Sequence, residues 1–377
     1  MCLMTVGITF SAGCEKYGGK KGLIVSSHPA LEGVAEHLQP QMVRLMNMGL
    51  ASSTWDGVRI IQNSISKMER KYDLDLKLPW TRTHAVNYVL ALTMEQLAPG
   101  TVRTYISRVR SLHHSKGMTP GWEEDDIRLL MKGVCNLPRK NTPKKLAVTP
   151  ALLRILKEKI MSSQWPEMRK HMVWAACCLL YNGALRAGEV LSPSASRFDA
   201  SSTLRRRDLT LVKENVAGKS VTYIRMLIRN PKEFRSVGEV TVEILPAPGT
   251  FFCPVEAVRK FLKCTRGFPQ SMPLLRTEST LLCKSHLNSI LKEMLDPALD
   301  YGIIRSHSFR AGLTTALARA GVSDEILQSL GRWHSSAYRS YIKMGRNLRM
   351  STQEKLISTL SEMASSNWGV STALLVA

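Results

Sequence analysis

Apolar residues recur at every third or fourth position through the first third of the chain, which is the spacing of an amphipathic helix. The pattern predicts a helical segment at 30–50, interrupted by Pro40, and a second helix after Ser53 with the apolar stripe Trp55, Val58, Ile61, Ile65 and Met68. Further helices are expected at 83–92, after Pro99-Gly100 with Thr101 as the cap, and at 125–134. Residues 29–136 are therefore expected to form one compact helical domain.

The rest of the chain carries two kinds of pattern. Helical spacing predicts helices at 150–161, 168–181, 253–264 and 286–294, and one that Ser306 or Ser308 caps and that runs through Arg319. Between them, β-rich runs separated by polar turns occupy 209–212, 221–228 and 240–245, which predicts a small antiparallel three-stranded sheet. The expected fold class is thus mainly α with a small antiparallel β-sheet, and the second domain is expected to span 149–377, with a C-terminal tail helix at 350–363.

Two segments lack any hydrophobic period. Residues 1–28 are rich in Gly, Ser and Lys and are expected to be a flexible leader. Residues 137–148 combine two prolines with the cations Arg139, Lys140, Lys144 and Lys145. Proline keeps such a segment extended, so we interpret it as a linker whose cations follow a nucleic-acid backbone. A plain tether with solvated charges, or a nuclear-import patch, is the alternative.

The charge balance narrows the class of partner. The chain has 377 residues, with 52 Lys and Arg against 30 Asp and Glu, a net charge of +22. Such a surplus favours a polyanion, and nucleic acid before a membrane surface, because no apolar run approaches the roughly 20 residues that span a bilayer. The mildly apolar N-terminus lacks the basic start of a signal peptide. Eight scattered cysteines without a CxxC pair predict reduced intracellular thiols, neither a zinc site nor a disulfide scaffold.

Candidate chemistry concentrates near the C-terminus. His307 and Arg310 lie three positions apart and face the same way on a helix. Arg310 offers a planar set of donors for phosphate oxygens, His307 can donate or shuttle a proton near neutral pH, and Tyr341 carries a nucleophilic oxygen. Upstream, Arg186 begins the helix after a helix-stop at Asn182-Gly183, with Glu189 as a ready partner. This set suits phosphoryl transfer, although a purely structural Arg186–Glu189 salt bridge is the alternative.

In order and spacing these motifs resemble the tyrosine recombinases, the phage-integrase superfamily of DNA strand-exchange enzymes. The resemblance rests on His307-x-x-Arg310, on Gly331-Arg-Trp333, on a Tyr341-Ile pair 31 residues after Arg310, and on Asn-Gly-Ala-Leu-Arg-Ala-Gly-Glu-Val-Leu at 182–191. The residues around Arg186 and those from His307 to Tyr341 are most similar to the Crypton-type and DIRS-type recombinases of eukaryotic mobile elements. The resemblance implies an N-terminal core-binding domain at 29–136 and a catalytic domain at 149–377.

The resemblance also implies roles for single residues. Tyr341 would attack a DNA phosphodiester to form a 3′-phosphotyrosyl link, while Arg186 and Arg310 stabilise the negative charge and His307 assists proton transfer. Lys232, on the turn between the second and third strands, would protonate the leaving 5′-oxygen, with Arg229 and Lys219 as substitutes because the Pro-Lys-Glu context is unusual. Trp333 would fill a second-histidine position, for which Arg332 and His334 compete, and its alternative role is core packing. Tyr338 is expected to be a packed aromatic.

The implied partner is double-stranded DNA. Arg103, Arg108 and Arg110 are candidate phosphate contacts on the fourth helix, or else a solvated face. A homo-oligomer on DNA is expected, with a dimer at each site and a tetrameric synapse, and the apolar end at 370–377 either packs on its own domain or docks on a neighbour. No metal or cofactor is expected because the two arginines supply the charge. The expected location is the nucleus in a eukaryote and otherwise the cytoplasm. A catalytically idle, domesticated DNA-binding protein and a type IB topoisomerase-like enzyme are the alternatives.

Overall fold

The computed structural model describes residues 28–49, 52–138, 144–196, 198–200, 202–216, 219–229, 239–299, 302–333 and 335–341. The chain divides into two compact units, Met1–Asn141 and Thr142–Ala377, and each is described by itself. The division falls inside the predicted linker. The predicted tail helix and residues 1–27 of the predicted leader lie outside the described residues, whereas the last leader residue, His28, is buried and its Nε2 lies 3.0 Å from the His114 carbonyl oxygen. None of the described helices is long and apolar enough to cross a membrane.

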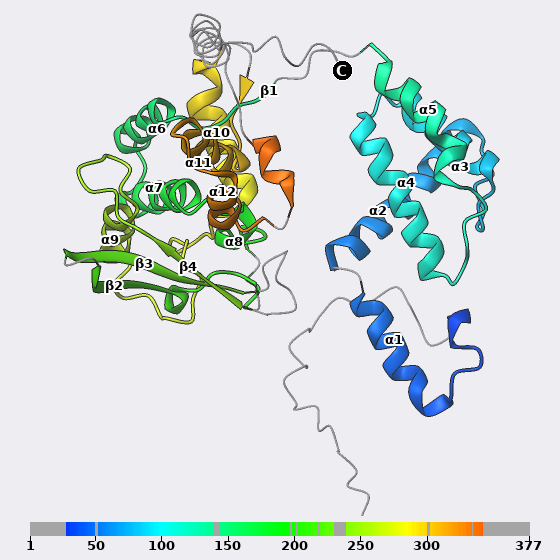
Figure 1. Ribbon diagram of the computed structural model, residues 1–377, viewed down its shortest axis with the longest axis horizontal. Coiled ribbons are helices and arrows are strands. Elements are labelled where there is room, and N and C mark those ends of the chain that lie inside the picture. The colour runs from blue at the N-terminus through cyan, green and yellow to red at the C-terminus, as the bar shows by residue number, and fades with distance from the viewer. Residues whose placement is uncertain are drawn as a thin grey trace, which may run out of the picture. The chain divides into compact units, whose positions relative to one another are not determined.

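The described part of the first unit is a bundle of α-helices (Figure 1). Short 3₁₀ turns at Pro29–Leu31 and Glu36–Leu38 precede it, and the helices are α1 (Gln39–Met48), α2 (Ser52–Tyr72), α3 (Arg82–Met94), α4 (Pro99–Ser115) and α5 (Glu124–Asn136). The apolar stripe predicted for the second helix is buried in full and packs on α3 and α4. The predicted periodicity is confirmed for α2 to α5, whose apolar residues share one core. The stripe predicted for 30–50 does not form a buried face, because α1 has no buried residue and both Leu38 and Leu45 are exposed.

Two helix starts differ from the prediction. Helix α4 begins at Pro99, and its N-cap is Ala98, three residues before the predicted cap Thr101. Proline suits the first helical position because its φ is preset and its missing N–H would have no partner there. Helix α11 has Ser306 at its N-cap but no side-chain cap bond, and the Ser308 hydroxyl instead accepts from the Arg305 N–H at 3.1 Å.

The second unit is built around α7 (Glu167–Asn182), in which every residue from Met172 to Tyr181 is buried. The helices that follow or flank it are α6 (Pro150–Ser162), α8 (Ala187–Val190), α9 (Pro254–Cys264), α10 (Lys284–Leu295), α11 (His307–Arg319) and α12 (Asp324–Gly331), and a 3₁₀ helix, Ser336–Tyr341, ends the described chain. Contacts with α6, α9 and α11 make α7 the central helix of this core. Figure 1 shows it between α6 and α9.

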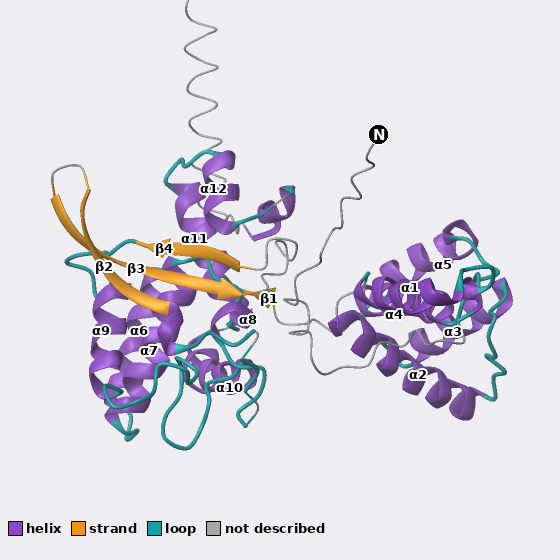
Figure 2. Cartoon of the chain, turned by 90° about the horizontal axis from the view of Figure 1, so that it is seen from below, coloured by secondary structure: helices purple, strands orange, loops and turns teal. Residues whose placement is uncertain are grey.

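The predicted three-stranded sheet is present. Strands β2 (Leu209–Val216), β3 (Lys219–Arg229) and β4 (Glu239–Ile244) pair antiparallel in the order β2-β3-β4. Figure 2 shows them as one layer beside the helices. In the second half of β3, alternate residues, namely Ile224, Met226 and Ile228, are buried in the core that α7 and α9 also form. This alternation is the reason the sheet packs on the helices through one face.

One pairing was absent from the sequence prediction. Lys144 and Lys145 form the short strand β1, parallel to β5 (Gly302–Ile303). The end of the predicted linker is thus part of the second unit, next to the segment that leads into α11. With mainly helical structure and one small antiparallel sheet, the predicted fold class is confirmed.

Candidate active site

Arg186 lies at the turn between α7 and α8. Helix α7 ends at Asn182, Ala184 takes a left-handed conformation with φ of 45°, and Arg186 becomes the N-cap of α8. The Arg186 backbone N–H donates to Glu189 Oε2 at 2.8 Å and its Nη1 donates to Oε1 at 3.1 Å. The predicted pairing with Glu189 is therefore present. Because Glu189 is 8% exposed, this carboxylate fixes the start of α8 and the arginine together.

Arg310 lies beside the same turn. It is fully buried on α11, and its Nη1 donates to the Ala184 carbonyl at 2.9 Å. Its Nη2 donates to the Gly331 carbonyl at the end of α12. Since Ala184 is two residues before Arg186, the fold brings the two predicted arginines to one place from positions that are far apart in the sequence.

The ring of Trp333 packs against the guanidinium of Arg310. The Arg310 guanidinium lies over the Trp333 ring at 4.1 Å from its centroid, and the indole is 7% exposed in a small core with Leu327 and Tyr338. A guanidinium over an aromatic face gains electrostatic attraction and loses freedom to rotate. The core-packing role that the sequence left open for Trp333 is thus present, and the phosphate-donor role stays a prediction.

His307 is exposed at the first position of α11. Partial burial lowers the pKa of its imidazole below the usual 6.5, and four cations lower it further: Lys284, Lys145, Arg310 and Arg186. Four cations near an accessible imidazole favour an anion there, because a bound phosphate would offset the cations' mutual repulsion. Sequence reasoning did not single out Lys284, the first residue of α10, since a lysine at a helix start is ordinary.

The depressed pKa of His307 predicts a pH dependence of stability. The folded state disfavours the protonated ring, so the stabilisation is present above about pH 6.5 and is lost as pH falls through the lower folded pKa. We expect the free energy of unfolding of the native chain to decrease relative to that of His307→Asn between about pH 7.5 and pH 5.5. Urea denaturation of both proteins across this range measures the difference. Parallel curves would refute a cationic surrounding for His307.

The predicted proton donor, Lys232, is one of the residues that the structure does not describe. It lies on the segment after β3, whose last residue is Arg229. Arg229 pairs with Asp208 through two bonds and with Glu239 at 3.3 Å, and the hydrogen bond to Asp208 raises its pKa. A guanidinium held this way is a poor proton donor. Lys219 begins β3, about 33 Å from its other end at ~3.3 Å per residue, so neither substitute fits the role.

The two candidate nucleophiles share one 3₁₀ helix, Ser336–Tyr341. Tyr338 is 3% exposed, and its ring centroid lies 6.0 Å from that of Trp333. A hydrogen bond with Asp324 raises the pKa of Tyr338, so the phenol stays protonated near neutral pH. The prediction that Tyr338 is a packed aromatic is confirmed. The backbone of Tyr341 ends the described chain, and His334 lies outside the described residues.

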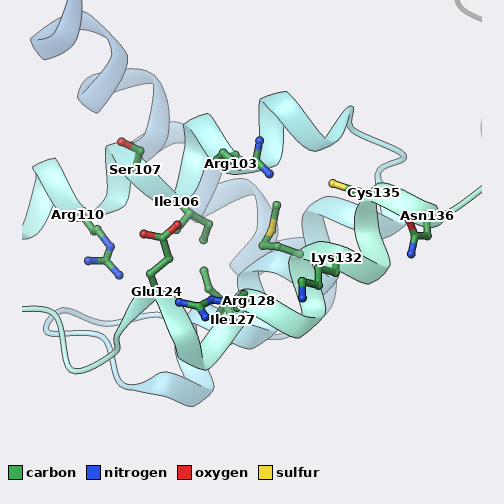
Figure 3. A pocket seen from close by; sticks show the side chains of 11 residues that line it. Arg103, Ile106, Ser107, Arg110, Glu124, Ile127, Arg128, Lys132, Cys135 and Asn136 are labelled. Atoms are coloured by element: carbon green, nitrogen blue, oxygen red, sulfur yellow. The ribbon is translucent and has the colours of Figure 1, made fainter. Parts of the chain in front are cut away.

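The predicted DNA contacts of the first unit fall on different sides of α4. The Arg108 guanidinium donates to the Thr54 carbonyl at 2.6 Å and ties α4 to α2. Arg103 and Arg110 instead line a cavity of about 790 Å³ between α4 and α5, opposite Glu124 and Arg128 (Figure 3). All three remain predictions as phosphate contacts, but Arg108 already has a structural role.

The structure describes two of the four predicted linker cations. Arg139 and Lys140 lie outside the described residues. Lys144 and Lys145 form β1, and Lys145 is close enough to His307 to lower its pKa. Among the described residues, no group of three or more His, Cys, Asp or Glu side chains could hold a metal ion.

Gly331 is required by the ring that supports Arg310. A Cβ at Gly331 would overlap the Trp333 ring, so Gly331→Ala must displace the indole from beneath Arg310. We expect a loss of about 1–3 kcal/mol in the free energy of unfolding. The matched control is Gly133→Ala in α5, where a Cβ meets nothing within 4 Å and alanine is expected to stabilise the helix by about 0.5–1 kcal/mol. Chemical denaturation of both variants tests the contrast, and equal effects would contradict it.

No protein-family model and no curated protein sequence matches this chain. Solved structures do match. The XerH site-specific recombinase bound to palindromic difH substrate, in a post-cleavage complex, is 13% identical with a TM-score of 0.52, covering 89% of this chain and 86% of that chain. Its pre-cleavage complex with difH is 13% identical with a TM-score of 0.51, covering 83% of each.

An integrase of the Tn1549 transposon, in complex with a circular intermediate DNA, is 15% identical with a TM-score of 0.49, covering 85% of this chain and 98% of that chain. The two XerH matches extend over both units of the chain, so the likeness concerns the pair of domains and not one of them alone. The chain therefore has the two-domain fold of the tyrosine recombinases.

Proposed function

We propose that this protein cuts and rejoins duplex DNA through a covalent 3′-phosphotyrosyl intermediate, as a site-specific recombinase or transposase. The observation that carries the proposal is the convergence of Arg186, Arg310 and His307 at one place, with Glu189 as the carboxylate that pairs with Arg186 there. An exposed imidazole next to two buried or half-buried guanidinium groups offers charge and donors to a phosphate. The shared fold with DNA-bound recombinases supports the same assignment.

The proposed reaction has two balanced transfers. The Tyr341 phenol oxygen attacks the phosphorus as its proton passes to a base, and the bond to the 5′-oxygen breaks as that oxygen takes a proton from Lys232. The 5′-hydroxyl of a second strand then attacks the phosphotyrosine as its proton passes to the Lys232 amine, the bond between phosphorus and the Tyr341 oxygen breaks, and the phenol oxygen takes its proton back from the base. Arg186 and Arg310 stabilise the negative charge of the phosphorane-like state, and His307 assists proton transfer. Because the bond energy is kept in the phosphotyrosine, no ATP is consumed.

The same proposal extends to partners and location. The DNA-bound form is a dimer at each site and a tetramer at the synapse, and the source is a mobile element of Crypton or DIRS type. A recombinase of a eukaryotic element acts in the nucleus. The excess of 22 positive charges supports DNA as the partner.

Two other functions make different predictions. A domesticated DNA-binding protein would need the scaffold but not the reactive groups, yet the chain holds both arginines, the histidine, the lysine and the tyrosine. A type IB topoisomerase-like enzyme would relax supercoiled plasmid without a specific site and as a monomer. Plasmid relaxation compared with site-dependent exchange separates this activity from recombination.

The decisive experiment is to trap the adduct. The full chain is incubated with a library of nicked duplexes of random sequence, in which cleavage next to the nick releases a short strand and prevents religation. We expect a protein–DNA adduct that survives denaturing gels, and sequencing of the bound DNA then reports the target. A chain that binds the library but yields no adduct would leave the DNA-binding alternative in place of the recombinase.

A further inference from the structure

Helix α12 ends in a turn that normally requires glycine. The Trp333 N–H donates to the Gln328 carbonyl and the Arg332 N–H to the Ser329 carbonyl, each at 3.0 Å, which is the pair of bonds of a Schellman motif. Arg332 occupies its left-handed position, with φ of 55° and ψ of 52°. A residue with a Cβ is unfavourable there, and such strain is most often kept where a side chain has a task.

The side chain that this turn presents reaches the Arg186 site. Arg332 Nη2 donates to Glu189 Oε2 at 2.8 Å, across 143 positions of the sequence. The Arg332 side chain is 11% exposed and that of Glu189 is 6% exposed, so the pair is largely shielded from water. Shielding makes such a bond stronger and more directional than an exposed ion pair.

Glu189 is thereby held from two sides. One oxygen accepts from Arg186 Nη1, and the other accepts from both the Arg186 backbone N–H and Arg332 Nη2. Three donors fix the plane of the carboxylate, and Arg186 is the cation that this plane orients. Without Arg332, the described hydrogen bonds of the Glu189 carboxylate would all come from Arg186. The carboxylate and the Arg186 guanidinium could then rotate together.

We propose that Arg332 is a positioning residue, which acts through Glu189 to fix the Arg186 guanidinium for the reacting phosphate. The inference rests on the proposed function. It also gives one turn two tasks, because Gly331 and Trp333 hold Arg310 while Arg332 holds Arg186. The position that the sequence left open between Arg332 and Trp333 is thus shared, with each residue serving a different arginine.

Arg332→Gly is the variant that separates positioning from folding. Glycine is the preferred residue at a left-handed helix end, so the variant is expected to keep the melting temperature of the native chain or raise it. At saturating DNA, we expect the rate of adduct formation to fall about 100-fold, the effect of misplacing a reacting group by about 1 Å. The dissociation constant for DNA is expected to change less than about threefold. Arg332→Lys keeps a donor for Glu189 and should restore part of the rate.

A double-mutant cycle tests the route through Arg186. If Arg332 acts only through that residue, Arg332→Gly causes no further loss of rate in an Arg186→Lys background. Additive losses would overturn the proposal in favour of a direct phosphate contact, and an unchanged rate for Arg332→Gly in the native background would overturn it in favour of a surface ion pair. A native chain that forms no adduct at all would overturn the proposed function as well, which the other two outcomes leave intact.

Discussion

Tyr341→Phe is expected to abolish the covalent protein–DNA adduct on nicked substrates, whereas Tyr338→Phe is expected to retain it. Phenylalanine lacks the only atom that can form the phosphotyrosyl bond, so no residual rate is expected from Tyr341→Phe. Tyr338, in contrast, is 3% exposed beside Trp333, and its hydroxyl is bonded to Asp324 and Arg339. Its ring is therefore part of the small core that supports Arg310. Tyr338→Phe removes hydrogen bonds and some packing from this core, but it removes no atom that reacts.

DNA binding supplies the control for this pair. Both variants should bind the trapped target as the native chain does, because neither substitution removes a charge. Denaturing gels of reactions with labelled substrate give the adduct yield at matched occupancy. An adduct that persists in Tyr341→Phe and disappears in Tyr338→Phe would reverse the assignment, and persistence in both would place the nucleophile elsewhere.

The elements that could be predicted from the sequence are those whose apolar residues recur at a regular spacing. The stripe from Trp55 to Met68 and the alternation around Ile224 each define one buried face, so their elements follow from hydrophobic spacing alone. The start of α8 also followed, because Asn182-Gly183 stops α7 and leaves Arg186 beside Glu189. In these cases the signal lies within a few residues of the element that it predicts.

What sequence reasoning missed depends on contacts between distant residues. No local pattern shows that Lys144 and Lys145 pair with β5, since two residues are too few for a period. The left-handed turn at Arg332 was hidden because the glycine that marks a helix end stands one position earlier, where the Trp333 ring leaves no room for a Cβ. Likewise, the partner of Arg332 lies 143 positions away.

The second large effect is expected at Arg310. Arg310→Lys should slow adduct formation at least about 100-fold, since removing one preorganised donor from a charged transition state typically costs that much and lysine lacks the planar fork. Lysine is preferable to alanine here because Arg310 is fully buried and donates to two carbonyls, and each buried carbonyl left without a donor costs about 1–3 kcal/mol. Single-turnover cleavage at saturating DNA measures the rate, and thermal denaturation checks the fold.

A substrate with an uncharged phosphate analogue shows whether Arg310→Lys slows the reaction because charge stabilisation is lost or because the fold is disturbed. If Arg310 stabilises charge on the nonbridging oxygens, replacing one of them by a methyl group at the scissile position removes much of that need, so the ratio of native to Arg310→Lys rates should shrink on this substrate. If Arg310 only holds the Ala184 turn and α12 in place, the ratio should be the same on both substrates. Because the substitution is made in the DNA, the folded chain is identical in the two measurements. An unchanged ratio would make Arg310 a structural residue and leave Arg186 as the cation to test next.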